Sequence, residues 1–175
     1  MISVEQWYAS GQCHDVNGRD VFYQRAGQGE TLICIHGFPT VSWDFADIWS
    51  GLTSRFDTVA HDMLGFGRSD KTRRDITVSL QADIIEQLAM DLGVRRAHIL
   101  AHDLGDTVAQ ELLARQYDGS AKIEWLSCVF LNGGIFPEAH KPRRVQKLLA
   151  SPIGPLLAQL ISKRSYRNTM TGIFG

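Results

Sequence analysis

Cysteine is scarce in this 175-residue sequence, and its placement excludes two classes of small domain. The three cysteines, Cys13, Cys34 and Cys128, are odd in number and lack the spacing of a metal site. Cys34 and Cys128 lie inside apolar runs, so we expect reduced, buried thiols in a cytoplasmic protein. The sequence therefore predicts neither a disulfide framework nor a bound metal.

Long apolar runs and an excess of one charge are also missing. The opening "MISVEQWYASG" has no positive region followed by an apolar stretch, and no segment approaches membrane-spanning length. The formal net charge is -1, and the basic clusters at 140–147 and 162–167 are typical of a solvated face. We expect no membrane or nucleic-acid partner, and the sequence leaves the oligomeric state open. A hydrophobic content of 44% suits one globular domain with a real core.

Strand-like and helix-like segments alternate through the first 134 residues. Asn17-Gly18 between two short extended arms indicates a hairpin. Leu80, Ile84, Leu88 and Leu92 share one helical face, which Gly93 ends. This alternation predicts an α/β fold with a mostly parallel sheet and helices on both faces. The expected strands are 31–35, one beginning at 57, 96–101 and 123–134, and the expected helices are 42–56, 77–93 and 106–117.

The composition and the pattern of the sequence change after Gly134. Residues 135–175 are richer in proline, contain two short helical patterns and show no strand that would extend the sheet. We therefore predict two parts: residues 1–134 as the N-terminal portion of the α/β core, and residues 135–175 as the beginning of an incomplete helical cap.

The segment "AHDLG" (Ala101 to Gly105) predicts a tight turn between a strand and a helix, with Asp103 at its tip. Small flanking residues suit a strained turn that lifts a nucleophile off the sheet and points a helix N-terminus at it. Asp is also a favoured helix N-cap, and the turn alone does not separate the two roles.

A neighbouring loop favours the nucleophile interpretation. "HGFPT" (His36 to Thr40) follows a buried strand, where lipase-like folds place one donor of the oxyanion hole. The backbone NH groups of Phe38 and Leu104 are the candidate donors. "DMLGFGRSD" (Asp62 to Asp70) has only part of a dinucleotide fingerprint and opens no helix, so we interpret it as a structural turn and predict no cofactor.

With these motifs in this order, the sequence resembles the α/β-hydrolase superfamily, in its aspartate-nucleophile branch of epoxide hydrolases and haloalkane dehalogenases. Within it, "GDTVAQELL", "LNGGIFPEAHKP" and the final "FG" are similar to the mesoderm-specific transcript proteins. The resemblance runs from about Val21 to Gly175. It implies a doubly wound sheet with an edge hairpin at its start and a cap inserted after the sixth strand.

An aspartate nucleophile suits attack on a saturated carbon. The carboxylate is ionised at neutral pH and can open an epoxide or displace a halide, which forms an ester that activated water then hydrolyses. The resemblance implies a small apolar organic substrate. Leu104 and Phe38 stand where dehalogenases hold their halide donors, which favours epoxides. Tyr166 is the candidate that would polarise the epoxide oxygen, although packing also explains a tyrosine there. Asp106 replaces the glycine usual in epoxide hydrolases.

The acid and histidine expected downstream of the nucleophile are absent. None of the six histidines follows a last strand, and the "LNGG" segment, where some dehalogenases carry the acid, has Asn132 instead. His36 and His102 belong to the motifs and are expected to be structural. The sequence therefore predicts an inactive N-terminal fragment of a hydrolase with an apolar edge at 123–132. The alternative is a non-catalytic hydrolase-like protein that binds a ligand or partner.

Overall fold

The computed structural model describes residues 2–71 and 76–134, together with the single residues 151 and 162. The chain divides into two compact units, residues 1–135 and 136–175, and the detail below concerns the first. The predicted cap therefore lies outside the described residues, except for Ser151 and Ser162. In chain order the elements are α1 (Val4–Ser10), β1 (Gln12–Asp15), β2 (Asp20–Ala26), β3 (Thr31–Ile35), the 3-10 helix η1 (Ser42–Phe45), α2 (Trp49–Thr53), β4 (Asp57–His61), α3 (Val78–Asp91), β5 (Arg96–His102), α4 (Leu104–Asp118) and β6 (Glu124–Leu131).

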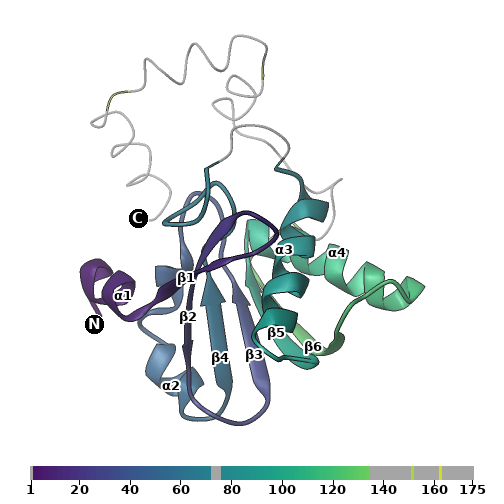
Figure 1. Ribbon diagram of the computed structural model, residues 1–175, viewed down its shortest axis with the longest axis horizontal. Coiled ribbons are helices and arrows are strands. Elements are labelled where there is room, and N and C mark those ends of the chain that lie inside the picture. Colours follow the sequence, from purple (N-terminus) through teal and green to yellow (C-terminus); the bar gives the residue numbers. More distant parts are fainter. Residues whose placement is uncertain (1, 72–75, 135–150, 152–161, 163–175) are drawn as a thin grey trace. The chain divides into compact units, whose positions relative to one another are not determined.

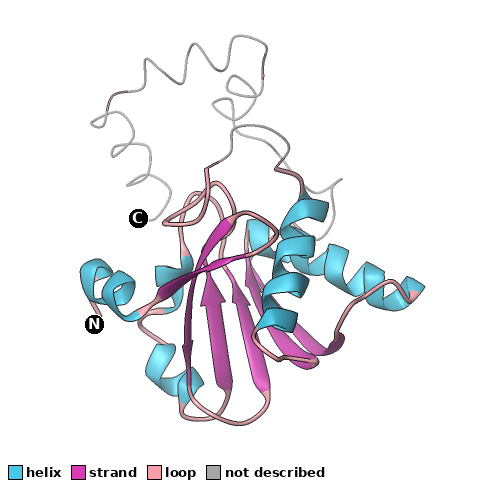
Figure 2. Cartoon of the chain, viewed as in Figure 1, coloured by secondary structure: helices cyan, strands magenta, loops and turns pink. Residues whose placement is uncertain are grey.

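The six strands form one sheet in the order β1-β2-β4-β3-β5-β6. β2 pairs antiparallel with β1 and β4, whereas β4, β3, β5 and β6 run parallel to one another. Figures 1 and 2 show the hairpin at one side of the sheet and α3 and α4 packed beside β5 and β6. The predicted mostly parallel α/β sheet with an edge hairpin is confirmed.

The hairpin turn follows from two residues. Asn17 and Gly18 have φ of 54° and 78°, and the amides and carbonyls of Val16 and Arg19 bond to each other across the turn. Positive φ at both central positions is what a two-residue hairpin with the twist of the flanking strands requires, and Asn-Gly adopts it readily.

Each face of the sheet carries its own apolar cluster. On one face Ile33, Ile35 and Ile99 pack under α3 and α4, with Leu88 and Leu112 from those helices. On the other, alternate residues of the same strands pack against α1, η1 and α2, and the members of this cluster include Leu32, Cys34, Ala60, Trp7, Phe45 and Trp49. Apolar residues at consecutive strand positions thus reflect burial on both faces.

Two N-terminal helices differ from the sequence prediction. The single helix expected over 42–56 is divided into η1 and α2, and the start of η1 is held by Ser42, which donates to the Asp62 carboxylate from its backbone N (2.9 Å) and its Oγ (2.7 Å). The segment also has few strong helix formers. The prediction missed α1, which Ser3 and Gln6 start with a reciprocal capping box and which the buried Trp7 anchors.

The strand β6 is less covered than the strands before it. Its one neighbour among the described residues is β5, and Val129 and Leu131 are 51% and 40% exposed. Cys128 and Phe130, which alternate with them, pack against the core under α4. The predicted apolar exposure is therefore real, and it concerns one face of β6 as well as its edge.

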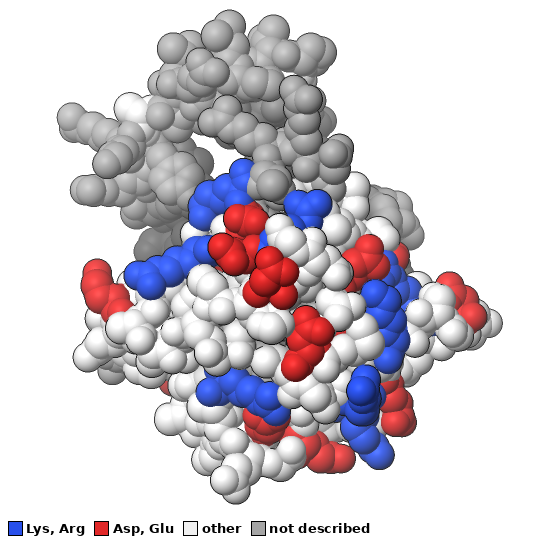
Figure 3. Space-filling model, in the orientation of Figure 1, with Lys and Arg blue, Asp and Glu red and all other residues white. Residues whose placement is uncertain are grey.

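In the view of Figure 3, basic and acidic side chains are interspersed over the described part of the surface, and neither kind forms a large patch there. None of the helices in the described ranges has both the length and the apolar content needed to cross a bilayer.

Candidate functional site

The candidate site lies where β5 passes into α4. Asp103 is the single residue between these elements, with φ 52° and ψ -113°, a conformation that L-residues rarely adopt. The close packing of α4 on β3 explains the glycine two residues later. A Cβ at position 105 would lie 2.4 Å from the Ile35 carbonyl oxygen. The sequence therefore builds a strained turn whose tip is the predicted nucleophile.

Two backbone amides converge on one oxygen of this carboxylate. Oδ1 of Asp103 accepts hydrogen bonds from the amide of Leu104 at 2.6 Å and from the amide of Phe38 at 2.8 Å. The second bond crosses 65 residues of sequence, and it is possible because Gly37 has no side chain. A Cβ there would lie 2.5 Å from the Asp103 Cβ. The three residues named from the motifs are thus brought together.

This arrangement holds an anion in place before any ligand arrives. Charged hydrogen bonds from backbone NH groups are stronger than neutral ones, and the N-terminus of α4 adds its positive dipole. Asp103 is partly exposed, and no hydrogen bond among the described residues engages its Oδ2. One oxygen is thus fixed, and no group in the described part of the chain binds the other. The same contacts also make Asp103 the N-cap of α4, so the two roles coincide.

His36 supports the loop that carries the Phe38 amide. Its buried ring donates from Nδ1 to the Gly37 carbonyl at 2.8 Å and accepts at Nε2 from the Met63 amide at 2.9 Å. Burial lowers the pKa of His36, which keeps the ring neutral in this tautomer. The structural role predicted for His36 fits these contacts.

A second polar group lies beside the turn. His102 Nδ1 is 4.0 Å from Asp44 Oδ2, and Thr40 donates its hydroxyl to the same carboxylate. Burial raises the pKa of Asp44, and the hydrogen bond from Thr40 opposes this shift. Sequence reasoning missed Asp44, which belongs to a segment interpreted there as an ordinary helix.

The glycine-rich loop after β4 is organised by one buried carboxylate. Asp62 accepts bonds from Ser42, from the Tyr8 hydroxyl at 3.0 Å and from the Arg68 amide at 2.8 Å. Gly67 has φ 48°, and a Cβ there would collide with Asp62. These contacts match a structural turn, as the sequence indicated.

Asp106 is a second carboxylate close to this turn, and unlike Asp103 it lies in the core. It lies in the first turn of α4, is fully buried, and its Oδ1 accepts a long hydrogen bond of 3.4 Å from the Leu131 amide at the end of β6. Burial raises the pKa of Asp106, while the amides of Leu131 and Gly133 oppose the shift.

The histidines that the structure describes do not supply a base to Asp103. His14 pairs with Asp91, His98 contacts Ser127 and Glu30, and His61 is buried in β4 without a hydrogen-bonding partner for its ring. Neither His36 nor His102 makes a hydrogen bond to the Asp103 carboxylate. The remaining histidine, His140, and the proposed epoxide contact Tyr166 lie outside the described residues.

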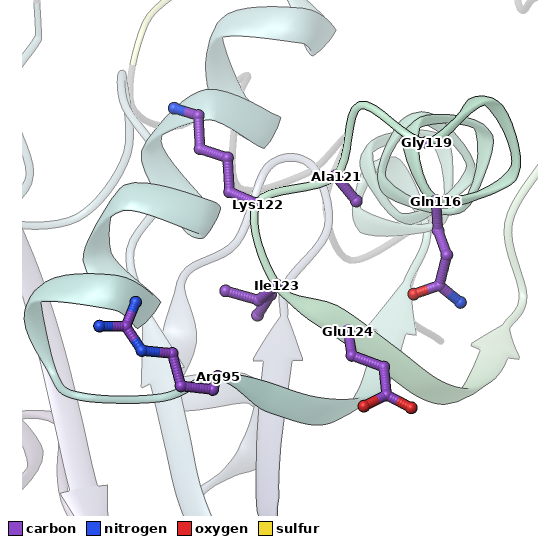
Figure 4. A pocket seen from close by; sticks show the side chains of 7 residues that line it. All are labelled: Arg95, Gln116, Gly119, Ala121, Lys122, Ile123 and Glu124. Carbon is purple, nitrogen blue, oxygen red and sulfur yellow. The ribbon is translucent and has the colours of Figure 1, made fainter.

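One surface hollow lies away from this site. It measures about 530 Å³ and is lined by Arg95 just before β5 and by residues from the end of α4 to the start of β6, among them Gln116, Lys122 and Glu124. Figure 4 shows these side chains around the loop that leads into β6. Asp103 lies at the carboxyl end of β5, whereas the hollow lies at the amino ends of the strands. In open α/β sheets ligands bind beyond the carboxyl ends, so we assign the chemistry to Asp103.

Comparison with known proteins identifies the family. A family model for the alpha/beta hydrolase fold matches residues 30–153. The chain belongs to the α/β hydrolase fold family. This α/β hydrolase-fold chain is 41% identical over 184 residues to the mesoderm-specific transcript protein of Mus musculus, covering 99% of the chain and 55% of that protein. It is 35% identical over 175 residues to LipZ of Mycobacterium tuberculosis, covering 98% and 60%.

Solved structures of hydrolases also superpose on this chain. The epoxide hydrolase CorEH matches with a TM-score of 0.65 at 21% identity, over 80% of this chain and 48% of that one. Epoxide hydrolase VrEH1 from Vigna radiata matches with a TM-score of 0.65 at 26% identity, over 80% and 45%. The resemblance inferred from the motifs is confirmed, and the α/β hydrolase-fold chain spans about half the length of the curated relatives it matches.

Proposed function

We propose that this chain carries the nucleophile and the oxyanion hole of an α/β-fold hydrolase that acts through a covalent alkyl ester on Asp103. The observation that supports the proposal is the pair of amides, from Phe38 and Leu104, bound to Asp103 Oδ1. They hold the carboxylate so that Oδ2 faces a reactant, and they stabilise the charge that later develops on Oδ1. Small apolar epoxides in the cytoplasm are the proposed substrates, in keeping with the name of the neighbour VrEH1.

The first step needs the carboxylate as nucleophile and one proton donor. Oδ2 attacks one carbon of the epoxide, the bond from that carbon to the ring oxygen breaks, and the oxygen takes a proton to become a hydroxyl group. Tyr166 is the proposed proton donor. The product is a hydroxyalkyl ester of Asp103, in which Oδ1 is the carbonyl oxygen.

The second step needs a base. Water attacks the ester carbonyl carbon, a base takes the proton of the water, and the charge moves to Oδ1, where the two amides stabilise it. The ester bond then breaks and releases a diol. Among the described residues no histidine is placed as this base, so we expect the chain alone to stop at the ester, without multiple turnover.

Mass spectrometry of the chain after incubation with an aryl epoxide tests the proposal. We expect one covalent adduct on the peptide that contains "AHDLGDT", stable over hours. Asp103→Asn should lower its rate at least about 100-fold, since a neutral amide is a poor nucleophile. Asp91→Asn, which changes an exposed carboxylate paired with His14, is the matched control and should label like the parent.

Absence of the adduct across epoxides and haloalkanes, in a chain that melts cooperatively, would overturn the proposal. That result would favour the non-catalytic alternative, in which the fold binds a ligand or partner. Multiple turnover that depends on Asp103 would instead show that the chain contains its own base.

A further inference from the structure

The loop that carries one of the two oxyanion-hole amides is fixed at both of its ends. This oxyanion loop, residues 36–42, connects β3 to η1. At its start, His36 accepts a hydrogen bond at Nε2 from the Met63 amide at 2.9 Å. At its end, Ser42 donates from its backbone N and its Oγ to Asp62 Oδ1, at 2.9 Å and 2.7 Å. Asp62 and Met63 are consecutive, so one short segment after β4 holds both ends of the oxyanion loop.

Two consecutive side chains of α1 bind the groups at the second of these ends. Tyr8 donates its hydroxyl to Asp62 Oδ2 at 3.0 Å, and Trp7 donates its indole NH to Ser42 Oγ at 3.0 Å. The two bonds span 54 and 35 residues of sequence. The helix α1, which precedes the sheet, therefore contacts both the carboxylate and the hydroxyl that hold the oxyanion loop.

Packing orients both donors of α1. Trp7 is fully buried and meets Trp49 edge-on, with ring centroids 4.9 Å apart. The Tyr8 ring lies 4.8 Å from the Phe22 ring. Burial raises the pKa of Tyr8, and the Asp62 carboxylate adds to this shift, so the phenol keeps its proton. Each donor is thus held toward its acceptor.

The glycine-rich loop after β4 is shaped to receive the tyrosine. A Cβ on Gly67 would lie 1.8 Å from Asp62 Oδ2 and 2.7 Å from the Tyr8 hydroxyl oxygen. Arg68 donates its amide to the same Asp62 oxygen at 2.8 Å, and its guanidinium lies 4.5 Å from the centre of the Tyr8 ring. The glycine makes room for the hydroxyl, and the arginine covers the ring. A hydroxyl at position 8 is therefore part of how this carboxylate is bound.

We propose that Trp7 and Tyr8 of α1 are positioning residues for the Phe38 amide of the oxyanion hole. The inference rests on the proposed function of Asp103. Asp62 fixes the end of the oxyanion loop, and that loop keeps its amide 2.8 Å from Oδ1 of the nucleophile. This amide stabilises the charge that develops on Oδ1 when the ester is attacked, and the stabilisation depends on the direction of the N–H bond. α1 thereby supports the reaction without touching the substrate.

Tyr8→Phe tests the inference because it removes the hydroxyl and keeps the ring. Tyr23→Phe is the matched control, since it removes a hydroxyl that accepts from the Gln12 side chain at 2.7 Å in the hairpin. Nuclear magnetic resonance gives the hydrogen-exchange rate of the Phe38 amide relative to that of the Ile33 amide in β3. We expect Tyr8→Phe to raise this ratio at least about fivefold and Tyr23→Phe to change it less than about twofold. A general loss of stability would not raise the ratio.

Hydroxylamine gives a second measurement, at the oxyanion hole itself. The Asp103 ester is first formed with an aryl epoxide, and hydroxylamine then attacks its carbonyl carbon. Charge develops on Oδ1, the bond from that carbon to Oδ2 breaks, and the diol leaves with a proton from the attacking nitrogen, which stays on the protein as a hydroxamate. Tyr8→Phe should lower the rate of diol release at least about threefold, whereas Tyr23→Phe should leave it unchanged.

A second variant guards against an effect peculiar to Tyr8→Phe. Ser42→Ala removes the hydroxyl that joins Trp7 to Asp62 and keeps the bond from the backbone N. It should change the exchange ratio and the hydroxylamine rate in the same directions. Ser54→Ala is its control, since it removes an exposed hydroxyl that bonds to the Gly51 carbonyl at the end of α2.

The outcomes separate the two proposals. If the ester forms but Tyr8→Phe and Ser42→Ala behave like their controls, the role of α1 is wrong and the nucleophile stands. A changed exchange ratio with an unchanged hydroxylamine rate also overturns the inference, because the loop would then move without consequence for the oxyanion hole. If no ester forms, the nucleophile proposal fails, and the exchange ratio alone decides whether α1 positions the Phe38 amide.

Discussion

β3 and β6 are both parallel neighbours of β5, and both are rich in apolar residues, yet they differ in what covers them. β3 has β4 on its other side, and Ile33 and Ile35 are 3% and 0% exposed. β6 has no second neighbour among the described residues, and Val129 is 51% exposed. An apolar strand sequence therefore predicts a strand, but the surrounding elements decide how much stability it contributes.

The comparison also separates two polar regions beyond the strand ends. The end of β3 leads into the loop whose Phe38 amide binds Asp103, and both ring nitrogens of His36 in that loop are hydrogen-bonded. The end of β6 leads to Asp106, which has an oxygen without a hydrogen bond to any described residue. The well-covered strand thus precedes a paired polar region, and the uncovered strand precedes one that is incompletely paired.

The largest expected effect is the loss of a buried side chain from β3. Ile35→Ala should lower the free energy of unfolding by about 2–5 kcal/mol, because it leaves a cavity that the packed core cannot close. Val129→Ala on β6 should lower it by less than about 1 kcal/mol, since half of that side chain is already exposed. Urea titration measures both. Equal losses would show that the exposed face of β6 is covered in solution.

A pH effect of intermediate size is expected from β4, the inner strand beside β3. Burial lowers the pKa of His61 to about 3, below its usual value of 6.5. The unfolded chain therefore binds a proton that the folded chain does not, and stability is complete above about pH 6.5 and falls as the pH drops toward 3.

The loss attributable to His61 should be about 2 kcal/mol between pH 7 and pH 5. Urea titration at the two pH values measures it, and His61→Leu should reduce the drop. Burial of His36 acts in the same direction, so part of the drop should persist in the variant. An unchanged drop would contradict the assignment to His61.

The reactivity of two natural cysteines allows the exposure of β3 and β6 to be compared without any mutation. Cys34 lies in β3 and is fully buried, whereas Cys128 lies in β6 and is half-buried. Burial raises the pKa of both thiols, to about 11 for Cys128.

We expect iodoacetamide to modify Cys128 at least about tenfold faster than Cys34, because reaction requires an accessible thiolate. Peptide mass spectrometry over time gives the two rates, with the exposed Cys13 as the internal reference. Similar rates at Cys34 and Cys128 would mean that β3 opens as readily as β6.

The smallest expected effect concerns a charge on the exposed face. Val129→Lys should change the free energy of unfolding by no more than about 0.5 kcal/mol, because a surface substitution removes little packing. It should nevertheless reduce self-association, measured by light scattering, since the apolar face is interrupted. A large loss of stability would indicate that Val129 packs against another part of the protein.

Local patterns predicted those elements whose signals do not depend on distant residues. Asn17-Gly18 marked the hairpin, the spacing of Leu80, Ile84 and Leu88 marked α3, and the small residues around Asp103 marked the turn. The capping pair Ser3 and Gln6 was equally visible, yet the short helix that it starts was overlooked, because two polar residues without a long apolar pattern are a weak signal.

Contacts between distant parts of the chain could not be predicted from the sequence. The start of η1 is anchored by Asp62, which lies 20 residues from Ser42 along the chain. The arrival of Asp106 at the end of β6 depends on how α4 packs against that strand. No spacing along the chain records either relation, although an aspartate where epoxide hydrolases usually have glycine was the one available sign.

The unequal binding of the two Asp103 oxygens has an isotopic consequence. With Oδ1 held by two amides, the proposed reaction uses Oδ2 for the bond to carbon, and the ester releases that same atom with the product. In water enriched in oxygen-18, the first diol formed carries no label, and the heavy atom enters the Asp103 carboxylate instead. In the proposed cycle the protein supplies one oxygen to its first product and replaces it from solvent, so its own mass rises once, with the first completed cycle.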